Sequence, residues 1–448
     1  MAASRKHPSN KTVADVVAAA LARHVGPHAR LTLALSGGLD SVVLLHLLHA
    51  LQNDLAFSLR AVHVHHGLSP NADRWAETCG RLCDTLGLAL ALHRVVVDPA
   101  DAAGVEAAAR RERQRVFAAL DTDFLLTAHH RDDQAETFLL QALRGAGPKG
   151  LAAMAECRRP AGWRAVQLRP LLEVARHDLL ACAETLGLSW IEDESNGDLR
   201  YRRNALRRRI LPALAPYFPG AAATLARAAA LQADAAGLLD ELAALDAAAA
   251  IDGERLDCAR LAALPAARAR NLLRYFIERR GQALPSARRL GEALHQLLDA
   301  RHDARVQVGL GAVELRRFRG HGYVVAAAPP PPPRLWHGEP ELAVPGWGSL
   351  CLHASPGQGL QRSRVPPGRL LLTTRAGGER LRLLPGGPAR SLRNLMQERA
   401  MPPWLRERLP LLKVDGVLVW AAEFGCHADW RAPADETGLL PGWRPAAA

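Results

Sequence analysis

Two short stretches of the chain combine residue types that suit phosphate chemistry. The first consists of Ser36, Gly37, Gly38, Leu39, Asp40 and Ser41. It stands between a run typical of a buried strand, 31–35, and an apolar helical pattern. Glycines let the backbone approach a phosphate closely, and the N–H groups and dipole of a helix N-terminus favour an anion. The stretch lacks the Gly-Lys-Ser/Thr ending of a Walker loop, so it indicates either a phosphate loop of another type or an ordinary strand–helix turn.

The second stretch, 127–137, places two histidines before a group of acidic side chains. On a helix, Asp132 and Asp133 would share a face with the glutamate that follows them by four and three residues. Acidic residues at a helix N-terminus can act simply as caps. Beside a triphosphate, carboxylates are also the ligands that Mg²⁺ prefers, and they can accept a proton from an attacking amine. His129 and His130 could donate to phosphate, orient the carboxylates, or merely pack as polar residues.

Two groups of arginines are further candidates for contact with an anion. Arg110 and Arg113 fall on one face of a helical pattern, which fits either a solvated surface or a cationic clamp on a nucleotide. The run 200–209 holds six arginines with Tyr201 among them. Arginine-rich helices bind phosphate backbones, and an aromatic ring can stack on an unpaired base. Because no Glu or Lys is mixed into this run, we favour RNA binding over a solvated helix.

Strand and helical patterns alternate through the first third of the chain. Strands are predicted at 31–35, 59–65, 88–97 and 124–128, and helices at 12–25, 73–86, 104–120 and 132–144. This alternation predicts βαβ units, and hence an α/β fold with a doubly wound, mostly parallel sheet. Ligands on such sheets bind beyond the carboxyl ends of the strands. The loop at 36–41, the histidines within 63–66 and the stretch after 128 are therefore expected to face one crevice.

After Gly145 the alternation fades. Helices are predicted at 203–250, 259–280 and 286–299, and short strands at 304–308, 312–318 and 322–327. Five consecutive prolines predict an extended linker. We therefore expect a catalytic domain, a mainly helical middle domain with a small sheet, the linker, and a small α+β C-terminal domain, at 1–215, 216–328, 329–333 and 334–448. A helix near 391–399 and a basic cluster from Arg375 to Arg393 are expected in the last domain.

Composition limits the class of protein and its partners. The 448 residues are 49% hydrophobic and 23% charged, as expected for several globular domains. The formal net charge of +12 favours a polyanionic partner, with nucleic acid ahead of a membrane. Seven cysteines without a Cys-x-x-Cys pair indicate a reducing compartment and argue against a zinc or iron–sulfur site. Because no secretory pattern or membrane-length apolar run is present, we expect a cytoplasmic protein without a membrane partner.

Together the motifs resemble those of the tRNA(Ile)-lysidine synthases, a family of pyrophosphate-loop ATPases. The loop Ser36–Ser41 and the segment His129–Thr137 match its two N-terminal signatures, which are the most specific. Further similar segments are Leu143–Gly147, Trp190–Asn196, Tyr201–Asn204, Ile210–Pro212, Ser391–Glu398 and Pro402–Leu412. The resemblance thus covers nearly the whole chain. One departure is His65–Ser69, where the family more often carries Asn first and Arg last.

The resemblance implies a fold and a reaction. The N-terminal domain would be similar to the adenine nucleotide α-hydrolases and would bind ATP at Ser36–Ser41. ATP would adenylate the C2 oxygen of the wobble cytidine in a tRNA(Ile) with a CAU anticodon, releasing pyrophosphate. The amine of free L-lysine would then displace AMP to form lysidine. The C-terminal domain would help to bind the tRNA, and a homodimer would be compatible with this family.

The resemblance also implies roles for individual residues. The catalytic residues would be Asp40, Asp132, Asp133, Arg110 and Arg113. Mg²⁺ would be held by Asp40 and Asp133. Because both lie in polar loops at predicted strand ends, we expect neither carboxylate to be needed for folding. The tRNA contacts would include Arg202, Arg203 and Arg207.

Two alternatives stand beside this interpretation. An ATP-dependent tRNA cytidine thiolase would share the loop and the adenylated base, but such enzymes commonly carry the paired cysteines that are missing here. A non-enzymatic tRNA-binding protein with a decayed loop is the second alternative. The intact Ser-Gly-Gly-x-Asp-Ser and Asp-Asp-x-x-Glu patterns argue against such decay.

Overall fold

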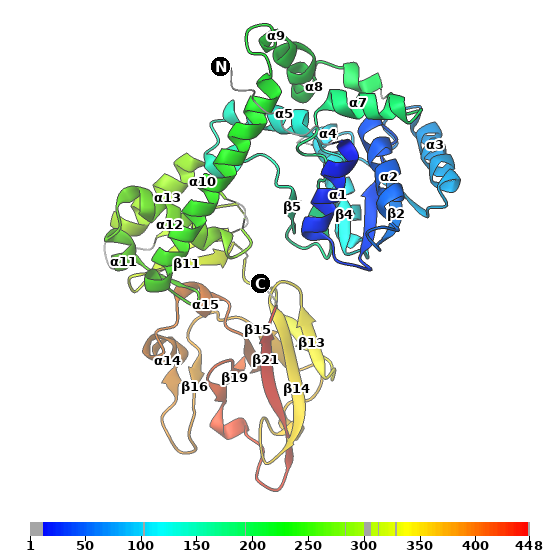
Figure 1. Ribbon diagram of the computed structural model, residues 1–448. Coiled ribbons are helices and arrows are strands. Elements are labelled where there is room, and N and C mark those ends of the chain that lie inside the picture. The colour runs from blue at the N-terminus through cyan, green and yellow to red at the C-terminus, as the bar shows by residue number, and fades with distance from the viewer. Residues whose placement is uncertain are drawn as a thin grey trace. The chain divides into compact units, whose positions relative to one another are not determined.

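The computed structural model of the chain describes residues 12–101, 104–192, 194–282, 284–299, 306–311, 313–327 and 329–446. Contacts within the chain divide it into two compact units, residues 1–247 and 248–448, which we describe separately (Figure 1). The finer division predicted from the sequence stays a prediction.

A six-stranded sheet organises the first unit. Its strands are β1 (Arg30–Ala34), β2 (Ser58–His65), β3 (Leu90–Arg94), β4 (Phe124–Leu126), β5 (Cys157–Arg158) and β6 (Val166–Leu168). Their order in the sheet is β3-β2-β1-β4-β6-β5, and every neighbouring pair is parallel except the edge pair β5–β6. The predicted α/β class and mostly parallel sheet are therefore confirmed. The sequence analysis missed β5 and β6, because strands of two and three residues are too short to show a period.

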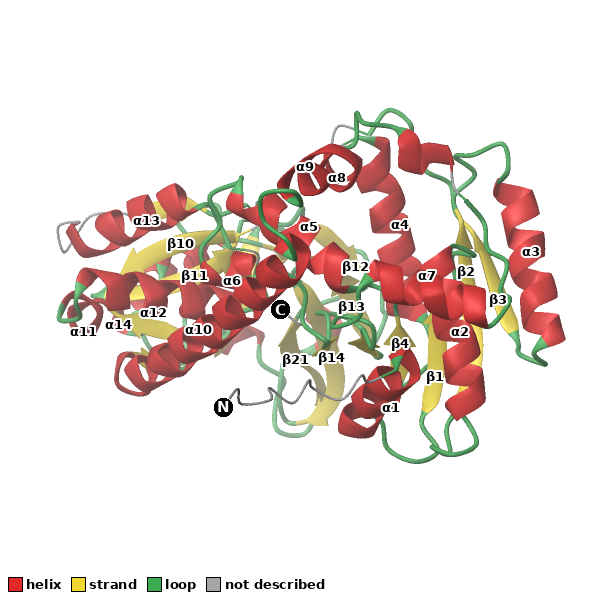
Figure 2. Ribbon diagram, turned by 45° about the horizontal axis from the view of Figure 1, so that its top comes forward, coloured by secondary structure: helices red, strands yellow, loops and turns green. Residues whose placement is uncertain are grey.

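Helices cover both faces of this sheet. The helices beside it are α1 (Val13–His24), α2 (Leu39–Leu51), α3 (Ala72–Thr85), α4 (Val105–Ala119), α5 (Arg131–Ala142), α6 (Pro148–Leu151) and α7 (Arg176–Thr185). Alternate residues of a strand point to opposite faces. On β1 and the residue after it, Leu31, Leu33 and Leu35 pack into one core with side chains of α1, α2, α3 and α7. Val62 and Leu125 pack into a second core with α4, and Figure 2 shows α1 and α2 on one side of β1. The predicted helices at 12–25, 73–86, 104–120 and 132–144 are confirmed to within a few residues.

The chain reverses its direction across the sheet between β1 and β4. From β1 it proceeds outward through β2 to β3, and from β4 it proceeds the other way to β6. In doubly wound sheets a crevice opens at such a switch point, beyond the carboxyl ends of the two central strands. The loop 36–41 follows β1, and the segment 129–133 follows β4. The topology therefore brings the two candidate stretches to the same edge of the sheet, as predicted.

The remainder of the first unit is helical. It comprises α8 (Arg202–Ala205), a π-helical turn (Leu206–Ile210), α9 (Leu211–Leu214) and the long α10 (Ala221–Ala250), which continues into the second unit. The helix predicted over 203–250 is thus confirmed with a break around residues 215–220. A π-helical turn widens the helix locally and is frequent at functional sites.

The second unit begins with three helices and a small antiparallel sheet. These helices are α11 (Cys258–Ala262), α12 (Ala266–Glu278) and α13 (Ala287–Asp299). The sheet has the order β7-β8-β11-β10-β9, with strands Ile251–Asp252, Arg255–Asp257, His321–Ala326, Val313–Phe318 and Gln307–Gly309. The predicted helices and the small sheet are confirmed. Residues 304, 305 and 312 of the predicted strands lie outside the described residues.

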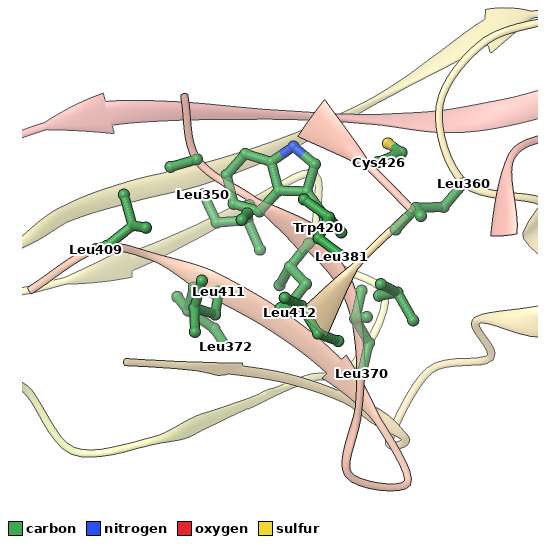
Figure 3. Close-up of a cluster of buried hydrophobic side chains, with 14 of the residues drawn as sticks. Leu350, Leu360, Leu370, Leu372, Leu381, Leu409, Leu411, Leu412, Trp420 and Cys426 are labelled. Carbon is green, nitrogen blue, oxygen red and sulfur yellow. The ribbon is translucent and has the colours of Figure 1, made fainter. Parts of the chain in front are cut away.

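Beyond the prolines 329–333, which adopt neither helix nor strand, the chain forms three further antiparallel sheets. Their strands are β12 (Arg334–Trp336), β13 (Glu341–Val344), β14 (Gly348–Pro356), β15 (Leu370–Thr373), β16 (Arg380–Leu381), β17 (Arg390–Ser391), β18 (Leu411–Val414), β19 (Val417–Ala421), β20 (Gly425–Cys426) and β21 (Thr437–Pro445). The helices are α14 (Leu392–Glu398), as predicted, and α15 (Pro403–Glu407). Leucines of β15 and β18 belong with Trp420 of β19 to one core of buried apolar side chains (Figure 3).

Two of the cysteines lie in the core of the first unit. Cys79 and Cys83 of α3 are fully buried, and burial raises the pKa of their thiols to about 12 and about 11. None of the helices in the described part of the chain is long and apolar enough to span a bilayer.

The turn from β1 into α2 packs against Ile191, a residue that is distant in the sequence. The N–H of Ile191 donates to the carbonyl of Gly37 at 2.9 Å. Gly37 has a φ of +84°, and a Cβ placed on it would lie 2.4 Å from Ile191 Cδ1 and 3.1 Å from Cys79 Sγ. Glycine is therefore required at position 37 both by its backbone conformation and by lack of space.

This packing predicts a stability difference between two glycine substitutions. Gly87 also has a positive φ, of +65°, but its Cβ would meet nothing within 4 Å. Gly87→Ala should therefore cost only the strain of the left-handed conformation, about 1 kcal/mol. Gly37→Ala should cost about 1–2 kcal/mol more because of the added clash. Urea unfolding measures both values. Adding Ile191→Ala to Gly37→Ala should recover the excess, and simple additivity of the two changes would contradict the steric explanation.

Candidate active site

Hydroxyl groups brace the loop between β1 and α2. Ser41 Oγ lies 3.0 Å from Ser36 Oγ and donates to the carbonyl of Gly38 at 3.0 Å. The N–H of Gly38 in turn donates to Ser36 Oγ at 3.3 Å. The first N–H groups of α2 have no intrahelical acceptor, and the helix dipole adds positive potential at this end. The N–H groups of Ser36, Gly38 and Ser41 are bonded within the loop. The loop is therefore a preformed anion cradle in which the N–H groups of Leu39 and Asp40, at the start of α2, are left for the ligand.

Three carboxylates surround one buried imidazole. His130 is 1% exposed, and its Nε2 lies 3.6 Å from Asp40 Oδ2 and 3.6 Å from Asp133 Oδ2. Its Nδ1 lies 3.7 Å from Asp132 Oδ2. The structure thus gathers all three predicted aspartates, from the first turns of α2 and α5, around a histidine at the end of β4. They can act on one substrate together.

The three aspartates differ in what else they contact. Burial raises the pKa of Asp40 against the opposing effect of His130, and no described residue donates a hydrogen bond to its buried Oδ1. Asp132 Oδ2 accepts from the N–H of Arg176 at 3.0 Å and so caps α7. Asp133 Oδ2 accepts from the N–H of His130 at 3.1 Å. Only Asp40 therefore has a buried oxygen left for a ligand that supplies positive charge.

Asp133 belongs to an ion cluster with Glu136 and two arginines. Arg203 donates from Nη2 to Asp133 Oδ1 at 3.0 Å and from Nε to Glu136 Oε2 at 2.7 Å. Arg207 donates from Nη2 to Asp133 Oδ1 at 3.0 Å and from Nε to Glu136 Oε1 at 2.6 Å. Burial opposes ionisation of Asp133, but His130 and Arg203 outweigh it and lower its pKa. The four side chains form a neutral set that ties α8 and the π-helical turn to α5.

This cluster bears on one expectation. Asp133 is 7% exposed, and removing its carboxylate would leave Arg203 and Arg207 to share the single carboxylate of Glu136. These contacts argue that Asp133 supports the local structure, whereas the sequence analysis expected it to be dispensable for folding. Asp40 has no such partners, and the prediction for it is unchanged.

The opposite side of the crevice is rich in arginine. Arg113 of α4 and Arg169, which follows β6, each have a buried Nε to which no described residue offers an acceptor. Burial lowers the pKa of both guanidinium groups, to about 10 in Arg169, and Arg110 lowers both further. His66, at the end of β2, has its pKa lowered to about 4 by burial and then by Arg113. Such an excess of buried cations favours an anionic ligand.

The arginines predicted as contacts fall into two groups. Arg113 has a buried Nε and lies close enough to His66 and His129 to lower their pKa values, whereas Arg110 and Arg202 are exposed. Arg203 and Arg207 bond to buried carboxylates, and their side chains are 31% and 35% exposed. Their predicted contact with tRNA stays a prediction.

The sequence analysis placed Glu136 on the same helix face as the two aspartates but gave it no role of its own, and it did not single out Gln167, Arg169 and Ile191. One signal could have revealed the cluster. Arg203 and Arg207 are four residues apart, and Asp133 and Glu136 are three apart, so each pair lies on one face of a helix and the two faces can meet.

Comparison with known proteins identifies the family. Family models match a PP-loop domain at residues 9–214, a TilS substrate binding domain at 256–323 and a TilS substrate C-terminal domain at 370–443. The tRNA(Ile)-lysidine synthase of Azoarcus sp. (strain BH72) is 46% identical over 425 residues, which cover 95% of this chain and 94% of that protein. The tRNA(Ile)-lysidine synthase of Nitrosomonas europaea is 39% identical over 448 residues, which cover 99% and 98%. With the phosphate loop and the acidic stretch meeting at one edge of the sheet, the chain belongs to the tRNA(Ile)-lysidine synthases, a family of ATP-binding ligases that modify tRNA.

Proposed function

We propose that this chain ligates free L-lysine to C2 of the wobble cytidine in the CAU anticodon of tRNA(Ile). ATP adenylates the C2 oxygen with release of pyrophosphate, and the lysine amine then displaces AMP. The observation that supports this most strongly is the meeting of the anion cradle at 36–41 with Asp40, Asp132 and His130 beyond β1 and β4. One crevice thus offers a place for a triphosphate, groups for an amine, and a sheet edge open to a base.

The residues present fit a divalent cation beside ATP. Asp40 Oδ1 is buried without a hydrogen-bond donor among the described residues, and an oxygen of this kind suits Mg²⁺. Asp133 is a poorer ligand than the sequence indicated, because Arg203, Arg207 and the N–H of His130 already bond its oxygens. When bound, Mg²⁺ would neutralise charge on the departing pyrophosphate.

Backbone and side-chain groups of the protein would bind the phosphates and accept the proton of the amine. The first N–H groups of α2 bind and orient the phosphates. The buried guanidinium of Arg113 offers a further donor to an anionic part of the substrates. Asp132, whose side chain is 33% exposed, is the better acceptor for the proton of the attacking amine, since Asp133 is held in the ion cluster. Holding amine and adenylated base in one crevice lowers the entropic part of the barrier.

Thiolation is not favoured by the cysteines. Cys79 and Cys83, one helical turn apart, are the nearest approach to a pair in the sequence. Both are buried behind the loop, and their raised pKa values keep them as inert thiols at neutral pH. They cannot carry sulfur to a base in the crevice.

We also propose that the second unit binds tRNA through arginines near Trp404. Arg406 on α15 has its pKa lowered by burial and by Arg375, Arg319 and Arg393, so four separate segments bring these guanidinium groups together. Among the described residues, neither Arg375 nor Arg393 has a carboxylate partner. Trp404 lies 5.0 Å from Tyr323, ring centroid to centroid. Unneutralised arginines beside aromatic rings suit a nucleic acid backbone.

The first prediction from the proposed function distinguishes lysidine synthesis from its alternatives. Purified protein with ATP, Mg²⁺ and tRNA(Ile) bearing CAU should leave the tRNA unmodified until lysine is added. Labelled lysine should then enter the tRNA in a one-to-one ratio with AMP released. Sulfur incorporation without lysine would instead support thiolation, and tRNA binding without AMP release would support the non-enzymatic alternative.

The second prediction contrasts two carboxylates of the site. Asp40→Asn should abolish AMP release but leave the free energy of unfolding within about 0.5 kcal/mol of the original, because the fold disfavours the Asp40 charge. Glu136→Gln should lower that free energy by about 3 kcal/mol, because it leaves two partly buried arginines short of a counter-charge. Urea unfolding and an AMP assay measure both variants. Wild-type AMP release by Asp40→Asn would exclude the proposed role of Asp40.

The third prediction concerns the arginines near Trp404. Replacing Arg375 and Arg393 by Gln should weaken tRNA binding and reduce the slope of log Kd against log salt by about one for each tRNA phosphate that is no longer neutralised. The matched control replaces Arg369 and Arg390, which pair with Asp415 and Glu398, and removes the same charge. Filter binding at several salt concentrations measures both. Equal slopes in the two double variants would show that only net charge matters.

A further inference from the structure

A chain of polar side chains lies behind His129, in the interior of the first unit. Gln167 on β6 is 3% exposed, and its Oε1 accepts from Arg169 Nη2 at 2.6 Å and from Arg158 Nε at 3.1 Å. Its Nε2 lies 3.4 Å from Thr127 Oγ1, at the end of β4. Thr127 Oγ1 lies 3.0 Å from His129 Nδ1. The chain thus runs from two arginines to the histidine without a gap.

The two arginines fix the direction of the first link. A guanidinium group only donates hydrogen bonds, so both arginines require the oxygen of the Gln167 amide. Rotating the amide by 180° would place its NH₂ group against two guanidinium donors. The NH₂ group of Gln167 must therefore face Thr127 and donate to its hydroxyl oxygen.

The direction of the remaining links follows from the number of protons. The oxygen of the Thr127 hydroxyl can accept two hydrogen bonds, but the group has one hydrogen to donate. Thr127 is buried, and Gln167 and His129 are the described residues within hydrogen-bond distance of its hydroxyl. Because Gln167 presents a donor, the hydroxyl hydrogen has its acceptor in His129 Nδ1, which must then be the unprotonated nitrogen of the ring. Burial lowers the pKa of His129 to about 3 despite Asp133, and Arg169 and Arg203 contribute to this, so the ring is neutral. A neutral ring without a proton on Nδ1 carries it on Nε2.

We propose that Gln167 is a positioning residue that acts through Thr127 to hold His129 in its Nε2–H tautomer, as a neutral hydrogen-bond donor to an oxygen of the reacting substrates. The proposal rests on the proposed function for the identity of those substrates. No described residue accepts from His129 Nε2, so this donor is available to a ligand. A neutral donor that is fixed in advance stabilises negative charge developing on oxygen, and it does not compete for the proton of the amine.

The direct test is Gln167→Glu, which keeps the shape of the side chain. The carboxylate can still accept from Arg158 and Arg169, but its second oxygen cannot donate to Thr127. The Thr127 hydroxyl must then donate to that oxygen, and its own oxygen is left to accept from His129. The proton of His129 should therefore move from Nε2 to Nδ1.

The tautomer is measured without substrates, by NMR on protein labelled with ¹⁵N-histidine, with the His129 signals assigned from His129→Gln. Protonated and unprotonated ring nitrogens differ widely in chemical shift, so an exchange of their assignments is easily seen. Because no substrate is present, this result does not depend on the proposed reaction. Retention of the Nε2–H tautomer in Gln167→Glu would overturn the proposal.

Kinetics supply the second measurement, with Gln134→Glu as the matched control. Gln134 of α5 is 9% exposed and bonds to the backbone of Met154 through both amide atoms, with no link to Thr127. Gln167→Glu should lower kcat about 10²-fold with little change in KM for ATP, because a donor becomes an acceptor. Gln134→Glu should keep the Nε2–H tautomer and most of kcat. Equal losses of kcat in the two variants would show that Gln167 is merely structural.

Two substitutions at Thr127 test the same link if the Gln167→Glu variant fails to fold. Thr127→Ser keeps the hydroxyl and should keep both the tautomer and kcat. Thr127→Val removes the hydroxyl with little change in shape, so it should release the tautomer and lower kcat. If the valine variant is as active as the serine variant, the link between Gln167 and His129 has no role and the proposal is wrong.

Discussion

The site depends on one electrostatic constraint, the fully buried charge of Glu136. A carboxylate removed from water must be paired and hydrogen-bonded, and here two guanidinium groups bond both of its oxygens. Because Arg203 and Arg207 are committed to Glu136, their remaining N–H groups reach Asp133 and hold it at the start of α5. The positions of α5, α8 and the π-helical turn are thus set by a single buried charge and its partners.

The same constraint separates the roles of neighbouring aspartates. Asp133 is held by cations and has a lowered pKa, whereas Asp40, at a similar distance from His130, has a raised pKa and an unpartnered oxygen. The oxygens of the first carboxylate are bonded to the protein, whereas the second has a buried oxygen to which no described residue donates. Sequence patterns treat the two residues alike, because both are aspartates in the first turn of a helix.

The fold was predictable from the sequence where patterns are long or chemically distinctive. The alternation through residue 144 predicted the parallel sheet, and the glycines of the 36–41 loop predicted its turn into α2. The edge containing β6 was not predictable, because three residues show no period and their partner β4 is distant in sequence. Missing β6 also hid Gln167, whose neighbours Thr127 and Arg158 approach only in the folded sheet.

The arginine run shows a second limit of sequence reasoning. Six arginines within ten residues suggested one RNA-binding surface, but the fold divides them by direction. Arg202 is exposed, whereas Arg203 and Arg207 turn to buried carboxylates. A helix of two short turns joined by a π-helical segment does not keep the 3.6-residue period on which such a prediction depends.

Adjacent histidines after β4 lie in opposite electrostatic surroundings, and this division organises the chemistry. His130 stands among three carboxylates, which suit a cation or an amine. His129 is close to Asp133 but also to Arg113, Arg169 and Arg203, so its surroundings carry an excess of positive charge that suits an anionic oxygen. Successive side chains of an extended segment point to opposite sides, so two neighbouring residues can serve both regions. A reaction in which an amine binds as an ammonium ion, gives up a proton to a carboxylate and then attacks an adenylated base needs both kinds of surroundings within one crevice, and the segment after one strand supplies them.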